Sequence, residues 1–328
     1  MNIIPLKELK DNIEAYYESG QSNYDKINAK VYSRDFLRNA FEIVAEGGNS
    51  KYKLLVPCEC QYSVLFRGQG CAYPTCRPIL YRDGISELDI FIERMKLAAL
   101  MELLDTHPIV KKVYFKEHYK VNYEGLAQHY GIKTAMLDFT SDIDVALFFA
   151  MCNYNKTQKK YEAVQSDDNV GVIYCISPIR IALDNFKNQN LFSNKIEVIG
   201  LQVFERPAMQ RGFALRMGEK EDLHAWECHF SYSKADSEEY LKRFGDGLWC
   251  NDILVDKVEE INAMTAFTPN HFRKAYELSG FLNCSKGKIR KLLAEKQIHI
   301  KSNASYPIFT SVEISDLPKI RNYHPIHD

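Results

Sequence analysis

The sequence predicts an α+β protein with a mixed, mostly antiparallel sheet that is flanked by helices. Short strand-like runs follow one another between Ile196 and Tyr232, whereas helical patterns dominate from Asp236 onward. The apolar run Val170–Ile176 has no polar face and therefore suits a strand in the middle of a sheet. Strands and helices that occupy separate stretches of the chain favour the α+β class.

The composition is that of a globular protein and limits the function classes. The 328 residues are 46% hydrophobic and 26% charged, with a formal net charge of −1. A chain that wraps nucleic acid would carry a basic excess, so only a local basic patch stays open. Met1–Lys10 is too short and too charged for a signal peptide, and the apolar run Val145–Cys152 is too short to span a membrane. We therefore expect a cytoplasmic protein without a membrane partner.

Four of the nine cysteines lie close together in the sequence, namely Cys58, Cys60, Cys71 and Cys76. Four thiolates are able to hold a tetrahedral zinc ion. Their spacings, Cys-x-Cys and Cys-x4-Cys, lack the paired CxxC of most zinc ribbons. We therefore predict reduced thiols that pack as small apolar groups, and no metal.

The first 50 residues are predicted to be helical. Leu6–Tyr17 and Asp35–Gly48 have helical patterns, and the second ends on a glycine pair, which is a common helix stop. A short strand is expected at Ser63–Phe66, and it runs directly into Arg67–Gly70. The two glycines of that segment would let the backbone turn tightly or approach a ligand closely.

Two helices are expected next. Ser86–Asp89 has the pattern of a capping box, and apolar residues recur at helical spacing up to Leu103, before Pro108. The second helix covers Tyr123–Tyr130, and Gly131 would close it in the left-handed conformation.

The densest pattern lies between Thr134 and Met151. Ala135–Phe139 is apolar enough for a buried strand end, although Asp138 interrupts it. Ser141–Asp144 has the pattern of another capping box, and the helix that follows is apolar nearly all round and therefore buried. Backbone N–H groups at this junction of strand and helix would suit an anion.

The rest of the chain is predicted in outline. Asn153–Asn169 is polar and suits the surface. Apolar and polar residues alternate in the strand-like run Trp226–Tyr232, which predicts one solvent-exposed face. Thr268-Pro269 is a typical helix start, Ser285–Gln297 is an amphipathic helix with a Lys/Arg face, and a short strand is expected around Phe309. The other strands expected here are Ile196–Gln202 and Gly212–Arg216.

Several blocks occur in order along the chain. They are Phe66-Arg67-Gly68-Gln69, Pro78-x-Leu80-x-Arg82, Leu126 to Gly131, Leu137 to Ser141 and Ala146 to Ala150. This set resembles the FRG domain, a bacterial and phage family named for its Phe/Tyr-Arg-Gly signature. The similarity extends to Arg206-x3-Gln210-Arg211-Gly212-Phe213 and implies an FRG-type domain over residues 51–315, helical from about residue 236. Residues 1–50 would form a helical N-terminal extension, and residues 316–328 a tail.

Two positions depart from the family pattern. Ala135 stands where the family commonly has an arginine, and Phe139 stands where it commonly has a tryptophan. If that arginine binds a ligand in relatives, this protein would bind a variant ligand or bind its ligand more weakly.

A second similarity is to ADP-ribosyltransferases. Arg67-Gly68 matches their arginine strand, and Thr140-Ser141 with Ala146–Ala150 matches their hydroxyl segment and helix. Val172–Ile176 then matches the apolar strand that follows. The resemblance implies an ADP-ribosyltransferase-like fold with NAD as a substrate, because an arginine fork and a hydroxyl pair suit recognition of its phosphates.

The resemblance also implies a catalytic glutamate. Glu205 is the first candidate, acting with Arg67, and Glu227 is the alternative. The residues expected to bind the ligand in one shared site are Arg67, Gln69, His129, Asp138, Thr140, Ser141 and Gln210. Simpler structural roles stay open for several of them, such as ion pairing for Arg67 and helix capping for Thr140 and Ser141.

Three function hypotheses follow. The first is a protein that binds a nucleotide-like ligand, with NAD-dependent ADP-ribosyl transfer or NAD cleavage in a toxin or anti-phage setting as its enzymatic form. The second is a non-catalytic sensor module that binds a ligand or a protein partner. The third is a nucleic-acid-associated defence component that uses the basic helix face at Lys286, Lys288, Arg290 and Lys291.

Overall fold

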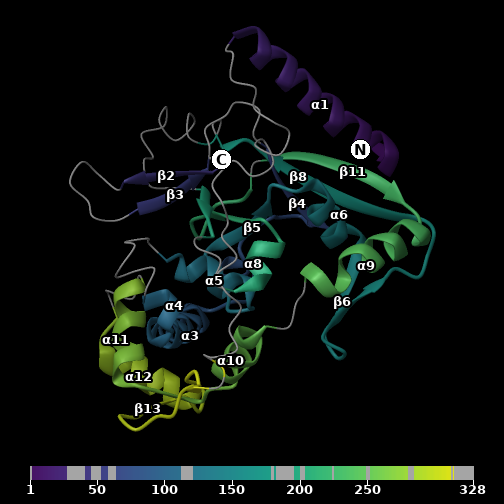
Figure 1. Cartoon of the computed structure of the whole chain (residues 1–328). Coiled ribbons are helices and arrows are strands. Elements are labelled where there is room, and N and C mark those ends of the chain that lie inside the picture. Colours follow the sequence, from purple (N-terminus) through teal and green to yellow (C-terminus); the bar gives the residue numbers. More distant parts are fainter. Residues whose placement is uncertain are drawn as a thin grey trace.

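A computed structural model describes most of the chain (Figure 1). The described residues are 2–27, 41–45, 53–57, 64–111, 121–178, 181, 196–199, 204–223, 225–248, 252–279, 284–311 and 313. Within them, the predicted α+β fold with a mixed, mostly antiparallel sheet flanked by helices is confirmed. The described helices include none with the length and apolar character needed to cross a membrane.

A seven-stranded sheet organises the described part of the chain. Across the sheet, the strands are β1 (Ile3–Pro5), β11 (Trp226–Tyr232), β8 (Asn169–Ile176), β4 (Leu65–Gln69), β5 (Met136–Thr140), β10 (Gly212–Arg216) and β9 (Ile196–Val198). β1 and β11 are parallel, and each other neighbouring pair is antiparallel. β8 is an inner strand as predicted, because Val172 and Ile173 are buried in apolar clusters on its two faces.

Helices cover one face of this sheet (Figure 1). α6 (Ile143–Met151) packs on β4 and β8, α5 (Tyr123–His129) packs on β5, and α8 (Glu205–Met209) packs on β10. α9 (Lys234–Leu248) packs against α6. α6 is buried on nearly all sides, as its sequence predicted, because it lies between the sheet and α9.

The N-terminal segment joins the same core. α1 (Leu6–Ile27) is longer than the predicted helix, and β1 precedes it at the edge of the sheet. Leu9 and Tyr17 of α1 are buried in the apolar cluster that surrounds α6. These residues therefore pack as part of the sheet and its core.

The C-terminal helices gather around α3 (Glu87–Thr106) at one end of the molecule (Figure 1). They are α10 (Ile253–Asn262), α11 (Pro269–Leu278) and α12 (Lys286–Glu295), with the strand pair β12 (Ala266–Phe267) and β13 (His299–Ile300). Phe91 of α3 shares an apolar cluster with Phe272 of α11 and Ile289 of α12. The smaller elements are the 3-10 turn η1 (Ile79–Tyr81), α4 (Pro108–Lys111) and the hairpin of β6 (Cys152–Asn155) and β7 (Lys160–Ala163).

Several helix ends lie where local signals predicted them. Ser86 caps α3, and its side chain and that of Asp89 form both hydrogen bonds of a capping box. Gly131 follows α5 with a φ of +94°, the left-handed conformation that glycine adopts without strain. Thr268 caps α11, and Pro269 occupies its first turn.

Three local predictions were wrong. Phe41–Ala45, expected to be helical, is strand β2 and pairs with β3 (Lys53–Pro57); the rest of the predicted helix lies outside the described residues. α6 is capped by Asp142, not by Ser141. Phe309 lies in no strand; its ring packs on the ring of His107 at a centroid distance of 5.0 Å.

A tight turn, one of the two roles expected for the glycines of Arg67–Gly70, does not form at Gly68, because β4 continues through it to Gln69. A β-carbon at position 68 would lie 1.8 Å from the carbonyl oxygen of Ala146 in α6. Glycine is therefore required for the close approach of the helix to the strand, and not for a turn. Since side chains alternate along a strand, Phe66 points toward α6 and Arg67 points to the opposite face of the sheet.

Replacement of Gly68 by alanine should be strongly destabilising. The added methyl group would force α6 away from β4, and overpacking of this severity costs about 3 kcal/mol or more. Urea unfolding followed by circular dichroism measures the loss. Gly70→Ala is the matched control, because a β-carbon there would lie 3.7 Å from its nearest neighbour, an ordinary contact. Equal stability of the two variants would contradict the packing described here.

Glu124 connects three elements near the start of α5. Its carboxylate lies 2.7 Å from Arg94 Nη1 of α3 and 2.5 Å from Arg216 Nη1 of β10. Burial opposes ionisation of this carboxyl, but the two guanidinium groups hold the pKa of Glu124 below its ordinary value of 4.5. The pKa of Glu124 is therefore lower in the folded than in the unfolded chain. The interaction stabilises the fold fully above pH 4.5, the ordinary pKa of the carboxyl, and this stabilisation is lost as the pH falls through the folded pKa.

Glu124→Gln should therefore lower the free energy of unfolding at neutral pH, by about 3 kcal/mol for a buried pair that loses one charge. The difference from the wild type should shrink as the pH is lowered below 4.5, the ordinary pKa of glutamate. Urea unfolding of both proteins over a pH series measures it. A difference that does not change with pH would exclude the ion pairs as its cause.

Candidate functional site

The residues expected to share one site lie on two faces of the sheet. Thr140 is opposite Phe66 in the β4–β5 register, so Thr140 and Asp138 face the helices. Arg67 and Gln69 alternate with Phe66 and face the other way. The prediction of a single hollow lined by all of these side chains is therefore wrong, and the structure forms two polar groups.

The group on the helical face is centred on His129, the last residue of α5. Its Nδ1 lies 2.9 Å from Gln210 Oε1, and Gln210 Nε2 donates to the carbonyl of Leu248 at 2.8 Å. Since the amide nitrogen of Gln210 is used as a donor, its oxygen accepts, and His129 Nδ1 carries a proton. Gly212 leaves room for this ring, because a β-carbon there would lie 2.9 Å from His129 Nε2.

Asp138 faces the other nitrogen of the same ring. Its Oδ1 lies 3.8 Å from His129 Nε2, and both atoms are buried without a hydrogen-bond partner in the described part of the chain. The Asp138 side chain is 33% exposed, whereas that of His129 is only 2% exposed. Asp138 therefore lies nearer to the surface, and His129 lies behind it in the interior. At 3.8 Å the two atoms are too far apart for a direct hydrogen bond, so each still has room for a polar partner.

Neighbouring side chains hold this pair in place. Gln128 Nε2 donates to Asp138 Oδ2 at 3.4 Å, and Gln128 Oε1 accepts from Thr134 Oγ1 at 2.8 Å. Arg206 Nη1 donates to the carbonyl of His129 at 3.3 Å. Gln128 and Arg206 were not predicted as site residues. Two signals were available: Gln128 precedes His129, and Arg206 lies four residues, about one helical turn, before Gln210.

The start of α6 does not form the predicted anion site. Thr140 Oγ1 accepts from the backbone N–H of Asp142 at 3.0 Å, and Asp142 Oδ1 accepts from that of Asp144 at 3.0 Å. These N–H groups are therefore occupied, and two carboxylates already lie at the positive end of the helix. Ser141 Oγ is buried without a hydrogen-bond partner in the described residues. Two cations lie at this end of the helix: Arg211 Nη1 is 3.5 Å from Asp142 Oδ2, and Arg243 Nη2 is 3.1 Å from Asp144 Oδ2.

On the opposite face, Arg67 holds the strand that carries Asp138. β4 and β5 pair directly only at Phe66 and Thr140. Beyond that pair, Arg67 Nη1 donates to the carbonyl of Asp138 at 2.9 Å. Arg67 Nε and Gln69 Oε1 are buried without partners in the described residues. Gln69 Nε2 contacts Cys76 Sγ at 3.9 Å, and burial raises the pKa of the Cys76 thiol. Arg67, Arg82 and Asp222 all lie close enough to influence the pKa of Cys76, so this second group contains charged side chains as well.

The two candidate catalytic glutamates lie on different elements. Glu205 is the first residue of α8, and its side chain lies outside the described part. Glu227 of β11 is opposite Tyr174 of β8, which is opposite Arg67, so Glu227 shares the face of Arg67. Glu227 Oε1 is hydrogen-bonded to His229 Nε2, and His229 is buried although the alternating pattern predicted it to be exposed.

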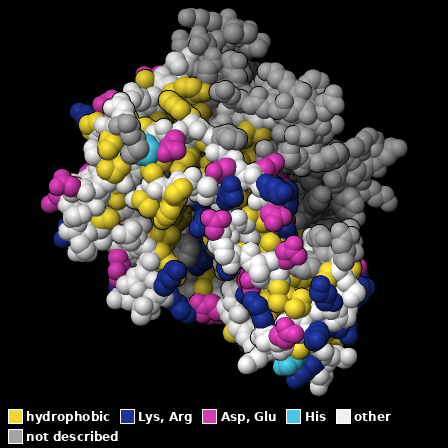
Figure 2. Space-filling model, turned by 180° about the vertical axis from the view of Figure 1, so that it is seen from behind, with side chains coloured by type: hydrophobic (Ala, Val, Ile, Leu, Met, Phe, Trp, Pro, Cys, Tyr) yellow, Lys and Arg dark blue, Asp and Glu magenta, His cyan; other side chains and the backbone are white. Residues whose placement is uncertain are grey.

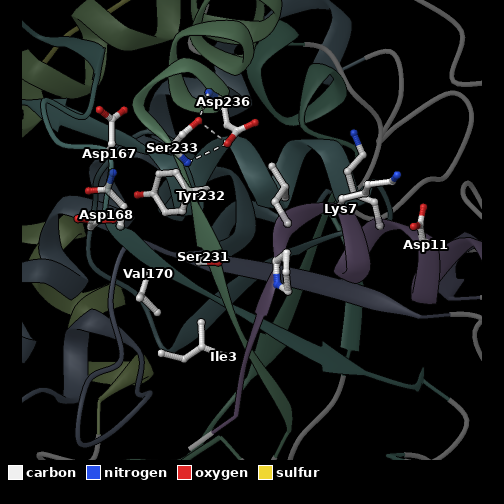
Figure 3. A pocket seen from close by; sticks show the side chains of 14 residues that line it. Ile3, Lys7, Asp11, Asp167, Asp168, Val170, Ser231, Tyr232, Ser233 and Asp236 are labelled. Carbon is white, nitrogen blue, oxygen red and sulfur yellow. Dashed lines mark hydrogen bonds between the residues drawn. The ribbon is translucent and has the colours of Figure 1, made fainter.

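A cavity of about 760 Å³ lies away from both groups (Figure 3). It is bordered by β1, the start of α1, the turn before β8 and the junction of β11 and α9. Asp236 at its rim is already bonded to Ser233, and none of the lining residues carries a buried, unpartnered polar atom. Its polar side chains are therefore satisfied or solvated, and the cavity offers no group that requires a ligand.

The described residues contain no cluster of three or more His, Cys, Asp or Glu placed to hold a metal ion. Cys71 and Cys76 are free thiols. Cys58 and Cys60, which completed the sequence cluster, lie outside the described part of the chain.

The fold is an α+β domain in which the sequence blocks that contain Arg67, His129 and Asp138 lie on neighbouring elements, namely β4, α5 and β5. Residues 62–159 match the family model of the FRG domain. The chain therefore contains an FRG domain, as its ordered sequence blocks predicted. Neither a curated protein nor a solved structure matches the chain. The similarity to ADP-ribosyltransferases thus stays a prediction from the sequence.

Proposed function

We propose that this FRG domain binds a nucleotide-like ligand at the pair formed by His129 and Asp138. The observation that supports the proposal is that Asp138 Oδ1 and His129 Nε2 lie 3.8 Å apart and are buried without a hydrogen bond in the described residues. A buried polar atom without a hydrogen bond costs about 1–3 kcal/mol. A ligand with two polar groups, such as a pair of ribose hydroxyls, would form one hydrogen bond to Asp138 and one to His129 and remove that cost.

The order of groups along β5 suits a nucleotide. Asp138 and Thr140 face the same side and are two residues apart, which is about 7 Å along a strand. Beyond Thr140, Arg211 provides a cation whose side chain is 35% exposed. A ribose hydroxyl at Asp138 would place a phosphate near Arg211, which would then exchange part of its contact with Asp142 for the phosphate.

Calorimetric titration with adenosine, AMP and NAD tests this proposal. The wild type should bind at least one of them saturably. Asp138→Asn should weaken that binding about tenfold or more, because a hydrogen bond to a charged group contributes about 1.5–3 kcal/mol. Arg211→Gln should weaken the binding of AMP and NAD but not that of adenosine.

Asp83→Asn is the matched control, since it makes the same chemical change at an exposed carboxylate outside the site. Thermal unfolding should show that all variants are folded. Absence of saturable binding to any of the three probes, or equal affinity of the wild type and Asp138→Asn, would refute the proposed site.

A second candidate function is cleavage of NAD on the opposite face of the sheet. The observation that favours it is the shared face of Glu227 and Arg67, on strands about 10 Å apart with β8 between them. Glu227 would stabilise the positive charge that develops on the ribose, and Arg67 would hold a phosphate.

Release of nicotinamide from NAD tests this second function. Glu227→Gln and Arg67→Ala should abolish release, whereas Asp138→Asn should retain it, because Asp138 lies on the other face. Glu205→Gln separates the two glutamates: loss of release in that variant alone would assign catalysis to Glu205 and exclude Glu227. No release above the buffer rate would exclude the enzymatic function.

A further inference from the structure

The C-terminal helices form a strongly basic segment within a chain that is almost neutral. Residues 269–301 contain eight Lys or Arg but only two Asp or Glu, a formal charge of +6. The whole chain carries −1, so the other residues together carry −7. The cations of the segment are Arg273, Lys274, Lys286, Lys288, Arg290, Lys291, Lys296 and Lys301.

Packing exposes these cations on one side. Ile289 and Leu293 of α12 have no exposed surface, because they are buried against α3 together with Phe272 of α11. Lys288 and Lys291 are exposed, and at 100° per residue they project away from the side that carries Ile289. Figure 2 shows Lys and Arg side chains gathered over this end of the molecule.

Most of this charge is not neutralised within the described residues. Arg273 is paired with Glu277 at 2.7 Å, and Lys296 with Asp89 at 2.6 Å. Lys286 and Arg290 lie over aromatic rings, which position a cation without cancelling its charge. 

Two lysines of α12 have no such contact. Lys288 and Lys291 form no ion pair in the part of the chain that the structure describes, and they lie side by side three residues apart. α12 thus presents adjacent, uncompensated charges on a rigid helix.

The chemistry of this surface favours a polyanion over a lipid bilayer. An amphipathic helix binds a membrane by inserting an apolar face, and the apolar face of α12 is already buried in the protein. A nucleic acid, in contrast, presents closely spaced phosphates, and each cation that contacts one releases a counterion.

We propose that the exposed surface of α11 and α12 binds nucleic acid through its phosphate backbone. Lys288 and Lys291 contact phosphates directly, with Lys286 and Arg290 beside them. Because contacts to phosphates carry no sequence information, this binding is independent of sequence. This function is separate from the ligand site at Asp138, which lies on the sheet and not on these helices.

Fluorescence anisotropy with a short labelled DNA duplex, and with a single-stranded RNA, tests the proposal at several salt concentrations. The logarithm of the affinity should fall linearly with the logarithm of the salt concentration. Lys288→Gln with Lys291→Gln should reduce that slope by about two, and should weaken binding about tenfold or more at low salt. The duplex and RNA arms show which form of nucleic acid is preferred.

The matched control is Lys220→Gln with Lys242→Gln, which removes the same charge at exposed positions on other elements. It should bind like the wild type. An equal loss in both double variants, or wild-type binding without salt dependence, would overturn the proposal. Equal or tighter binding to vesicles that contain phosphatidylserine would overturn it in favour of a lipid surface.

Discussion

Helix α6 lies so close to β4 that position 68 has no space for a β-carbon, which would be 1.8 Å from the carbonyl oxygen of Ala146. That contact determines which side of β4 faces the helices, so Phe66 enters the core and Arg67 emerges on the other side. Because α6 follows β5 directly, the same contact keeps Asp138 beneath the helices. The polar group around His129 depends on this layering.

The three residues of the FRG signature thus have three different physical roles. Phe66 fills the core under α6, and Gly68 permits the helix to approach. Arg67 reaches the carbonyl of Asp138 where the β4–β5 ladder ends, which secures the strand that carries the proposed ligand contact. The arginine therefore holds the backbone of β5 from one face of the sheet, while the side chains of Asp138 and Thr140 project from the other face.

The distribution of charge separates the molecule into two parts. Around His129, several buried donors and acceptors are matched by specific partners, whereas His129 Nε2 and Asp138 Oδ1, which lie 3.8 Å apart, form no hydrogen bond in the described residues. On the C-terminal helices, the cations outnumber their partners and lie on the surface. Buried, directional contacts suit a small ligand, whereas a solvated field of one sign suits a polyanion.

The sequence alone determined the helix ends and the helix burial that depend on residues close together in the chain. The capping box at Ser86, the left-handed Gly131 and the buried helix after β5 follow from local hydrogen bonds and periodicity. Tertiary structure decided which face each polar side chain occupies, because strand register and the approach of α6 are set by contacts far apart in the chain. For the same reason, the sequence could nominate Arg67 and His129 together but could not show that the sheet lies between them.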